Sequence, residues 1–121
     1  MTEERLSLGG WGEDQAVEYL RRQGMKIVER NYRAPVGEID IIARDRRYLV
    51  FVEVKTRRGM GFGTPQEAVG QRKQRQILRT AHWYLQRHRW AQLQPRFDVM
   101  GILCQSDGSA RIDHIADAFS L

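Results

Sequence analysis

Three ionisable residues, Asp40, Glu53 and Lys55, interrupt two apolar segments near the middle of this 121-residue chain. The segments occur in the stretch GEIDIIARDRRYLVFVEVKTRR, residues 37–58, which has the pattern of a β-hairpin with a basic turn. An unpaired charge is costly inside a sheet, so these side chains need partners. Two carboxylates held close together repel each other and favour a positive charge between them. We therefore expect a cation-binding site in this hairpin.

The number of residues in the hairpin loop decides which side chains share a face, because side chains alternate along a strand. With an even loop, for example Asp45–Arg46, one face is almost wholly apolar and holds Ile39, Ile41, Ala43, Tyr48, Val50, Val52 and Val54. The other face then holds Glu38, Asp40, Ile42, Leu49, Phe51, Glu53 and Lys55. An odd loop would scatter charges over both faces. The hydrophobic pattern therefore predicts that Asp40 lies alongside Glu53 and Lys55.

Oxygen ligands of this kind suit Mg²⁺ or Mn²⁺, which commonly use one or two protein carboxylates and complete their shell with water and phosphate. A cation held by Asp40 and Glu53 would neutralise charge on a scissile phosphate and activate a water molecule. Lys55 is placed to orient or help deprotonate that water, or to stabilise developing negative charge. The three residues thus predict phosphodiester chemistry.

A first helix is predicted over residues 11–23, with Gly24 as its C-terminal stop. Its apolar stripe consists of Ala16, Val17 and Leu20. Glu13 lies three, four and seven residues before them, so it shares that stripe and is expected to face the sheet. Glu13 could add a carboxylate to the same ion or to a second one. The alternative is an N-terminal acid favoured by the helix dipole.

The remaining elements are predicted as strands at about 26–32, 38–44, 48–56, 96–104 and 110–116, with a helix at about 71–88. The order αβββαββ is typical of an α/β domain with a mixed central sheet flanked by helices. The length fits a single domain covering residues 1–121. The segment GMGFGTP matches no phosphate-binding loop and is interpreted as a turn, with Thr64 capping and Pro65 starting a short helical turn.

The second helix combines an apolar and a basic face. Its core side is predicted to consist of Ile77, Leu78, Ala81, Tyr84 and Leu85. Lys73 falls on the same side, where it either passes the core with its stem or reaches a substrate phosphate. The opposite side carries Arg72, Arg75, Arg79 and Trp83. An aromatic among arginines can stack on a base, while a solvated helix face with one packed Trp is the simpler interpretation.

Composition and charge indicate the class of partner and the compartment. Twenty Lys and Arg against fifteen Asp and Glu give a net charge of +5, which favours an anionic partner, most commonly nucleic acid. Cys104 is the single cysteine, so an internal disulfide or a Cys-based metal cluster is excluded, and its apolar surroundings in VMGILC predict a buried thiol. No signal-peptide pattern and no membrane-spanning run occurs, so we expect a cytoplasmic protein without a membrane partner.

The spacing of the charged residues also resembles a known family. Asp40, followed by Glu53-Val54-Lys55, resembles the core of the PD-(D/E)xK nuclease superfamily, and Glu13 matches the helical glutamate that many members place before it. That resemblance implies a restriction-endonuclease-like fold. It also implies that Asp40 and Glu53 bind Mg²⁺ or Mn²⁺ with help from the carbonyl of Val54, that Lys55 is the catalytic lysine, and that Glu13 is an accessory acid.

A closer resemblance covers nearly the whole chain, from Gly12 to about Phe119. The segments GEDQAVEYL, RNYRAPVGEIDIIARD, FVEVKTRR, FGTPQEAV and RFDV resemble the YraN-like bacterial family. Within the superfamily, that group is similar to the Holliday-junction resolvases and other endonuclease-like proteins. One departure is Ile39, which stands where the nominal motif has proline.

Together these features predict a metal-dependent endonuclease that hydrolyses phosphodiester bonds in DNA, including branched or structured DNA. Residues expected to grip phosphates are Arg57, Arg58, Lys73 and Arg72. For the two arginines that end the hairpin, an exposed strand end is an equally good interpretation. The alternatives are a non-catalytic nucleic-acid-binding or adaptor module and a nuclease acting on RNA. Cutting both strands would require two copies of so small a domain, so we expect a homodimer.

Overall fold

The computed structural model describes residues 3–59, 65, 67–90 and 92–120. Over this part of the chain the order of elements is αβββαββ, as predicted. The elements are α1 (Glu3–Arg22), β1 (Lys26–Ala34), β2 (Gly37–Arg44), β3 (Tyr48–Arg58), α2 (Gln71–Arg87), β4 (Gln94–Cys104) and β5 (Ala110–Phe119). The strands match the predicted segments to within one to three residues at most ends.

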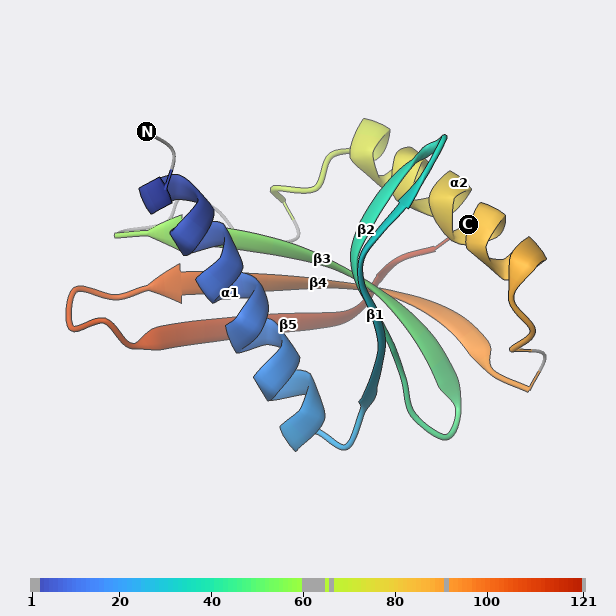
Figure 1. Cartoon of the computed structure of the whole chain (residues 1–121), viewed down its shortest axis with the longest axis horizontal. Helices are drawn as coiled ribbons and strands as arrows, with labels where there is room; N and C mark the ends of the chain where they lie inside the picture. Colours follow the sequence, from blue (N-terminus) through green and yellow to red (C-terminus); the bar gives the residue numbers. More distant parts are fainter. Residues whose placement is uncertain (1–2, 60–64, 66, 91, 121) are drawn as a thin grey trace.

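The five strands form one mixed sheet in the order β1-β2-β3-β4-β5 (Figure 1). β3 and β4 pair in parallel, while the other neighbours pair antiparallel. A parallel pair cannot be joined by a tight turn, and the chain between β3 and β4 therefore passes through α2. The prediction of an α/β domain with a mixed central sheet is confirmed for the described residues.

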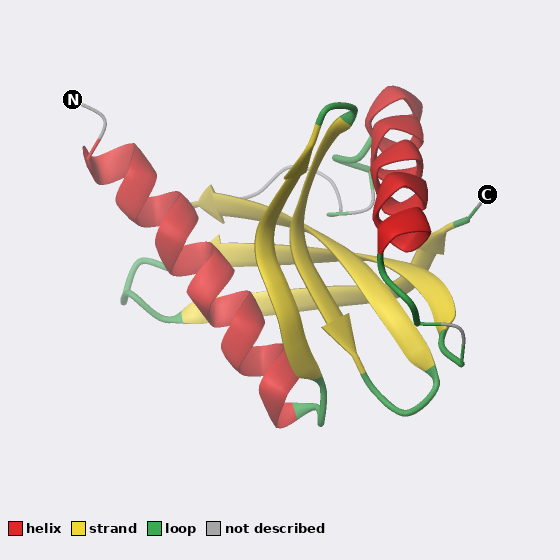
Figure 2. Ribbon diagram, turned by 45° about the vertical axis from the view of Figure 1, so that its right-hand side comes forward, coloured by secondary structure: helices red, strands yellow, loops and turns green. Residues whose placement is uncertain are grey.

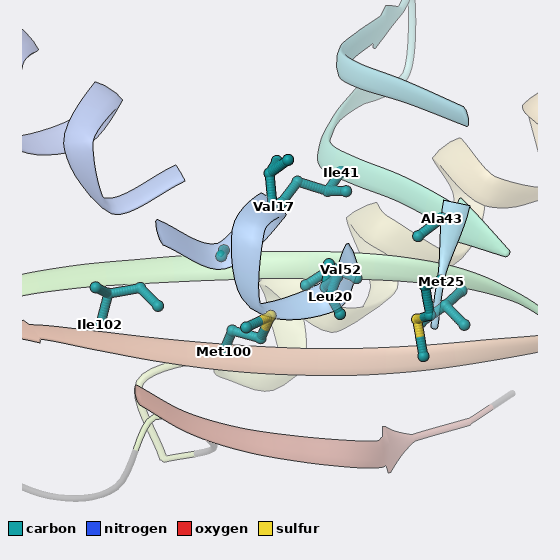
Figure 3. Packing of buried hydrophobic residues seen from close by; sticks show 10 residues of the cluster. Val17, Leu20, Met25, Ile41, Ala43, Val52, Met100 and Ile102 are labelled. Atoms are coloured by element: carbon teal, nitrogen blue, oxygen red, sulfur yellow. The ribbon is translucent and has the colours of Figure 1, made fainter. Parts of the chain in front are cut away.

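Two helices lie on opposite sides of this sheet (Figure 2). The core beneath α1 is built from buried residues of α1, β2, β3 and β4 and from Met25, which lies between α1 and β1. Eight of its residues are labelled in Figure 3: Val17, Leu20, Met25, Ile41, Ala43, Val52, Met100 and Ile102. The core beneath α2 contains Ile42, Leu49, Phe51, Ile77, Ala81, Tyr84, Phe97 and Val99. β2, β3 and β4 therefore divide their buried apolar side chains between the two cores, which is why a charged residue inside these strands is informative.

α1 begins earlier than predicted. It starts at Glu3 rather than near residue 11, because the helix continues through Gly9, Gly10 and Gly12, which lower helix propensity and hid its first turns from the sequence pattern. Gly12 has a packing role: a Cβ at this position would collide with the side chain of Thr56 on β3. The missing side chain therefore lets α1 lie close to β3. The predicted stop at Gly24 is confirmed, with φ +90°.

α2 presents most of the predicted core face. Ile77, Ala81 and Tyr84 are buried, Leu78 and Leu85 are half-buried, and Thr80 is an additional buried residue that donates to the carbonyl of Gln76. Arg72, Arg75 and Arg79 are exposed, as predicted. The predicted cap at Thr64 lies outside the described residues, and the N-cap of α2 itself is Gly70, without a side-chain cap.

The β2–β3 register confirms the even loop. Ile41 pairs with Val52, and Arg44 with Leu49. The amide of Asp45 donates to the carbonyl of Tyr48, so the two-residue turn is Arg46–Arg47 rather than the Asp45–Arg46 example. Its shape is fixed by the Asp45 carboxylate, which accepts hydrogen bonds from the backbone amides of residues 47 and 48. The paired ladder ends at Ile41 and Val52, directly before Asp40 on β2 and Glu53 on β3.

One residue of the predicted apolar face was placed wrongly. Ile39 was expected beside Ile41, but it belongs to the core beneath α2, whereas Ile41 belongs to the core beneath α1. The reason lies in the neighbouring strand, where Asn31 stands between the pairs Arg30–Ile41 and Tyr32–Ile39 with a left-handed φ of 53°. The β1–β2 hairpin bends there and reaches towards α2 (Figure 1). Asp40 occupies the bend.

Candidate functional site

Asp40 is held at the bend of β2 by the adjacent strand. Its Oδ2 accepts a 2.8 Å hydrogen bond from the backbone amide of Val54 on β3. The half-buried carboxylate is thereby fixed beside Glu53, as the register argument predicted. Val54 contributes its N–H to this contact, and the role of its carbonyl as a metal ligand stays a prediction.

Glu53 is a buried carboxylate with two lysine neighbours. Its side chain is only 6% exposed, and its Oε2 lies 3.5 Å from Nζ of Lys55 and 3.7 Å from Nζ of Lys73. Lys55 follows on the same face of β3, whereas Lys73 comes from the first turn of α2. The structure therefore brings Lys73 to the site and places both amines, each about one third exposed, at the boundary with solvent.

The pKa of Asp40 is raised from its usual value near 4 to about 7. Burial of the carboxyl is the largest cause, and repulsion from the Glu53 carboxylate is the second. The amide of Val54 and the charge of Lys73 act in the opposite direction without overcoming them. At neutral pH the pair thus favours additional positive charge, which a proton or a metal cation can supply.

The donor set fits a small hard cation. The two carboxylates lie on the adjacent strands β2 and β3, close enough that repulsion from Glu53 contributes to the raised pKa of Asp40. Mg²⁺ and Mn²⁺ require few protein oxygens, because water and phosphate complete their coordination. Asp40 and Glu53 are the residues that would hold such an ion.

Glu13 is positioned differently from the prediction. Its Oε1 accepts hydrogen bonds from Nε of Arg30, at 2.7 Å, and from Nδ2 of Asn31, at 3.2 Å. Arg30 also binds Asp14 at 2.7 Å, so α1 is clamped to β1 at the level of the bend. The charge of Glu13 contributes to the raised pKa of Asp40 as the smallest of its causes.

The structure does not assemble Glu13 with the two other carboxylates into a metal cluster. Among the described residues, no group of three or more His, Cys, Asp or Glu side chains is arranged to hold a metal ion. The partners of Glu13, Arg30 and Asn31, could not be found from the hydrophobic pattern, because they are exposed residues of β1. The accessory role of Glu13 stays a prediction.

The predicted phosphate-binding residues lie on β3 and α2, the two elements that supply Glu53, Lys55 and Lys73. Arg57 is half-buried and Arg58 exposed at the end of β3, two and three residues beyond Lys55. Arg72 is exposed at the start of α2, next to Lys73. The end of β3 and the start of α2 therefore border the same site with positive charge.

A hollow of about 390 Å³ adjoins this site at the tip of the β1–β2 hairpin. It is lined by Arg33, Ala34, Pro35, Val36, Gly37, Glu38, Lys73 and Gln76. Gly37 has φ +151°, and a Cβ there would approach Oγ1 of Thr80 to 2.7 Å, so the glycine lets the hairpin tip rest on α2. Lys73 is shared between the hollow and the carboxylate pair.

A second buried carboxylate serves the fold. Asp98 on β4 is fully buried and accepts hydrogen bonds from both Nε and Nη2 of Arg96, from the backbone amide of Asp117, and makes a 2.7 Å contact with Nε2 of His114. Burial opposes its ionisation, but these contacts outweigh it and lower the pKa of Asp98. Asp98 therefore ties β4 to β5 through His114 and Asp117 and holds Arg96 on its own strand. The part played by His114 had no sequence signal.

Cys104 differs from the prediction. It is a free, half-buried thiol rather than a buried one, because it ends β4 beside the exposed turn 105–109.

The model of "Uncharacterised protein family UPF0102" matches residues 12–102, which include the hairpin, the carboxylate pair, part of α1 and all of α2. The chain belongs to the UPF0102 family. A UPF0102 protein from Syntrophotalea carbinolica is 61% identical over 121 residues, covering 100% of this chain and 98% of that protein. UPF0102 proteins from Geotalea daltonii and Rhodococcus opacus are 50% and 48% identical and cover 95% and 94% of this chain.

The family range includes every residue of the candidate site. None of the described helices of this UPF0102 chain is long and apolar enough to cross a lipid bilayer.

Proposed function

We propose that this UPF0102 protein is a metal-dependent endonuclease with a PD-(D/E)xK, restriction-endonuclease-like domain. The observation that supports this proposal most is the pairing of Asp40 and Glu53 on adjacent strands, with the Asp40 pKa raised to about 7 and Lys55 beside Glu53. This arrangement concentrates negative charge in a half-buried position next to amines. It is suited to hold a cation and a phosphate together.

The roles of the chain's own residues follow from their positions. Asp40 and Glu53 would hold Mg²⁺ or Mn²⁺, which when bound polarises a phosphate and lowers the pKa of a water molecule. The amide of Val54 keeps Asp40 oriented, and the amine of Lys55 lies where it can stabilise charge that develops on the phosphate. Lys73 adds a second amine from α2.

Binding of the substrate would depend on the surrounding cations. Arg57, Arg58 and Arg72 border the carboxylate pair and are suited to contact phosphates on either side of the scissile bond. DNA is the proposed substrate, including branched DNA. Cleavage of both strands of a duplex or junction would require two copies of this domain, which we propose act as a homodimer.

The test is cleavage of linear, flapped and four-way DNA with Mg²⁺ or Mn²⁺. We expect the wild type to cut, and Asp40→Ala and Lys55→Ala to lose at least about a hundredfold in rate, the scale of an electrostatic catalytic group. Glu38→Gln is the matched control, since Glu38 is an exposed carboxylate of the same strand, paired with Arg33 at 3.5 Å. Undiminished cleavage in both site variants would exclude the proposed site.

A second candidate function rests on the two lysines. Lys55 and Lys73 already neutralise Glu53 without a metal, which would suit a non-catalytic nucleic-acid-binding or adaptor module. Binding that weakens steeply with salt, needs no divalent cation and leads to no cleavage would support that candidate. Including single-stranded and structured RNA in the same panel distinguishes an RNA nuclease from both.

A further inference from the structure

A second hollow lies between α2 and the tip of the β1–β2 hairpin. It has a volume of about 400 Å³ and is lined by Val36, Leu78, Arg79, His82, Trp83 and Gln86. Most of this lining is apolar, and Val36, at 37% exposure, is the exposed large hydrophobic residue of the described chain. The hairpin tip and α2 together therefore leave an apolar cavity open to solvent, of the size that holds a small planar ligand.

The surface around this hollow is strongly basic. Arg72, Arg75 and Arg79 are exposed along the same helix, and within the described residues none of the three forms a salt bridge. α2 contains no Asp or Glu, so nothing on the helix itself offsets their charge. An apolar cavity bordered by uncompensated arginines is complementary to an anionic chain that carries apolar groups.

Trp83 is held in place within the hollow. The guanidinium of Arg87 lies 3.4 Å from the centroid of the indole ring, and Nη1 of Arg87 donates a 3.0 Å hydrogen bond to the carbonyl of Trp83. One face of the indole is thereby covered by a cation, and Trp83 is one of the residues that line the hollow. A ring oriented in this way can act as a stacking surface without further ordering.

The hollow is connected to the candidate site along α2. Lys73, which contacts Glu53, and Trp83 are ten residues apart, about 15 Å along the helix axis. The hairpin tip lies between them, because residues 33–38 line the first hollow and Val36 also lines the second.

We propose that the hollow around Trp83 binds an unpaired base of a nucleic-acid strand whose phosphates lie along the arginines of α2. That the strand runs along α2 towards the carboxylate pair rests on the proposed function. The inference adds that the substrate is a nucleic acid with a single-stranded segment. The base enters the apolar cavity beside Trp83, Leu78 and Val36, while Arg79 contacts the adjoining phosphate. Paired bases are excluded, because their edges and faces are occupied within the duplex.

The test measures binding without cleavage. Fluorescence anisotropy in EDTA compares a fluorescein-labelled twelve-residue oligothymidylate with a strand of equal length and charge that has abasic positions at its centre. We expect the wild type to bind the intact strand about tenfold more tightly, the effect of stacking one base. Trp83→Ala should abolish this preference while leaving the affinity for the abasic strand unchanged, and Trp83→Phe should retain part of it.

Two further variants keep the test decisive even if Trp83→Ala does not fold. Val36→Ser changes an exposed residue of the hairpin tip and should also reduce the preference for the intact strand. Arg79→Gln should weaken both strands to a similar degree and lower the salt dependence, as expected of a phosphate contact. Equal affinity of the wild type for intact and abasic strands would overturn the proposal, as would a uniform loss in Trp83→Ala.

The same samples distinguish other outcomes. If sedimentation shows that the wild type self-associates and that Trp83→Ala abolishes this association without changing DNA binding, the hollow is a protein interface and the proposal is wrong. A base preference that depends on Trp83 in a protein that cuts no substrate would retain this inference and refute the nuclease. Cleavage of DNA by a protein that shows no preference for the intact strand would refute this inference and retain the proposed nuclease.

Discussion

Replacing Asp40 by Asn should stabilise the metal-free protein at alkaline pH. In the folded protein the pKa of Asp40 is raised from 3.8 to about 7, so the folded state binds this proton more tightly than the unfolded chain does. The wild type must therefore lose stability as pH rises from about 4 to about 7. A shift of about three units corresponds to about 4 kcal/mol at 1.36 kcal/mol per unit. Shared titration with Glu53 and relaxation of the site reduce the expected effect to about 2 kcal/mol.

Asn is a close replacement, because its amide oxygen can still accept the hydrogen bond from the amide of Val54. Urea unfolding in EDTA at pH 5 and pH 8 measures the effect. We expect the variant to exceed the wild type by about 2 kcal/mol at pH 8 and by only about a third of that at pH 5, where the unfolded chain has already lost this proton but the folded protein still holds it. Glu38→Gln, an exposed control on the same strand, should change the free energy of unfolding by less than about 0.5 kcal/mol at either pH. A variant less stable than the wild type at pH 8 would refute the reasoning.

Two other changes test the framework that positions the site. Asp98→Asn should lower the free energy of unfolding by about 3 kcal/mol, because it leaves Arg96 and His114 without their buried anion. Chemical unfolding at neutral pH measures this change. A loss below about 1 kcal/mol would contradict the prediction. Since the pKa of Asp98 is lowered, the wild type should also lose stability as pH falls through about 4 and below, and the variant should lack this part of the acid dependence. Gly12→Ala should destabilise the protein by about 1–3 kcal/mol, because its Cβ would collide with Thr56. Gly10→Ala, whose Cβ would meet no atom within 4 Å, should be neutral or stabilise by up to about 1 kcal/mol. Equal melting temperatures of the two variants would show that α1 does not pack against β3 as described.

The pairing of the two site strands could be predicted from sequence because only one loop parity separates charged from apolar residues. Side chains of β2 and β3 alternate between the two faces of the sheet from Ile41 to Glu53, and this alternation is sufficient to predict that Asp40, Glu53 and Lys55 lie together. It failed at Ile39, where alternation stops at a bend opposite Asn31. The left-handed conformation of Asn31 in β1 changes the pleat of β2 beside it, and the sequence of β2 alone does not predict this change.

Contacts between distant elements were the least predictable part. Glu13 was expected at the carboxylate pair because it lies on the apolar stripe of α1, but Arg30 and Asn31 compete for it from β1. The resting of the hairpin tip on α2 depends on Gly37, because a Cβ there would collide with side chains of Gln76 and Thr80. Periodicity reports which face of an element is buried, and the identity of its neighbour follows only from the tertiary arrangement.

The central claim, that Asp40 and Glu53 hold a divalent cation, is tested most directly by Mn²⁺ titration followed by electron paramagnetic resonance, which detects the free aqueous ion. We expect the wild type and Glu38→Gln each to remove one Mn²⁺ per chain from solution. Asp40→Asn and Glu53→Gln should remove none over the same concentration range. Equal binding by the wild type and Asp40→Asn, or a wild type that leaves Mn²⁺ free at millimolar concentration, would contradict it.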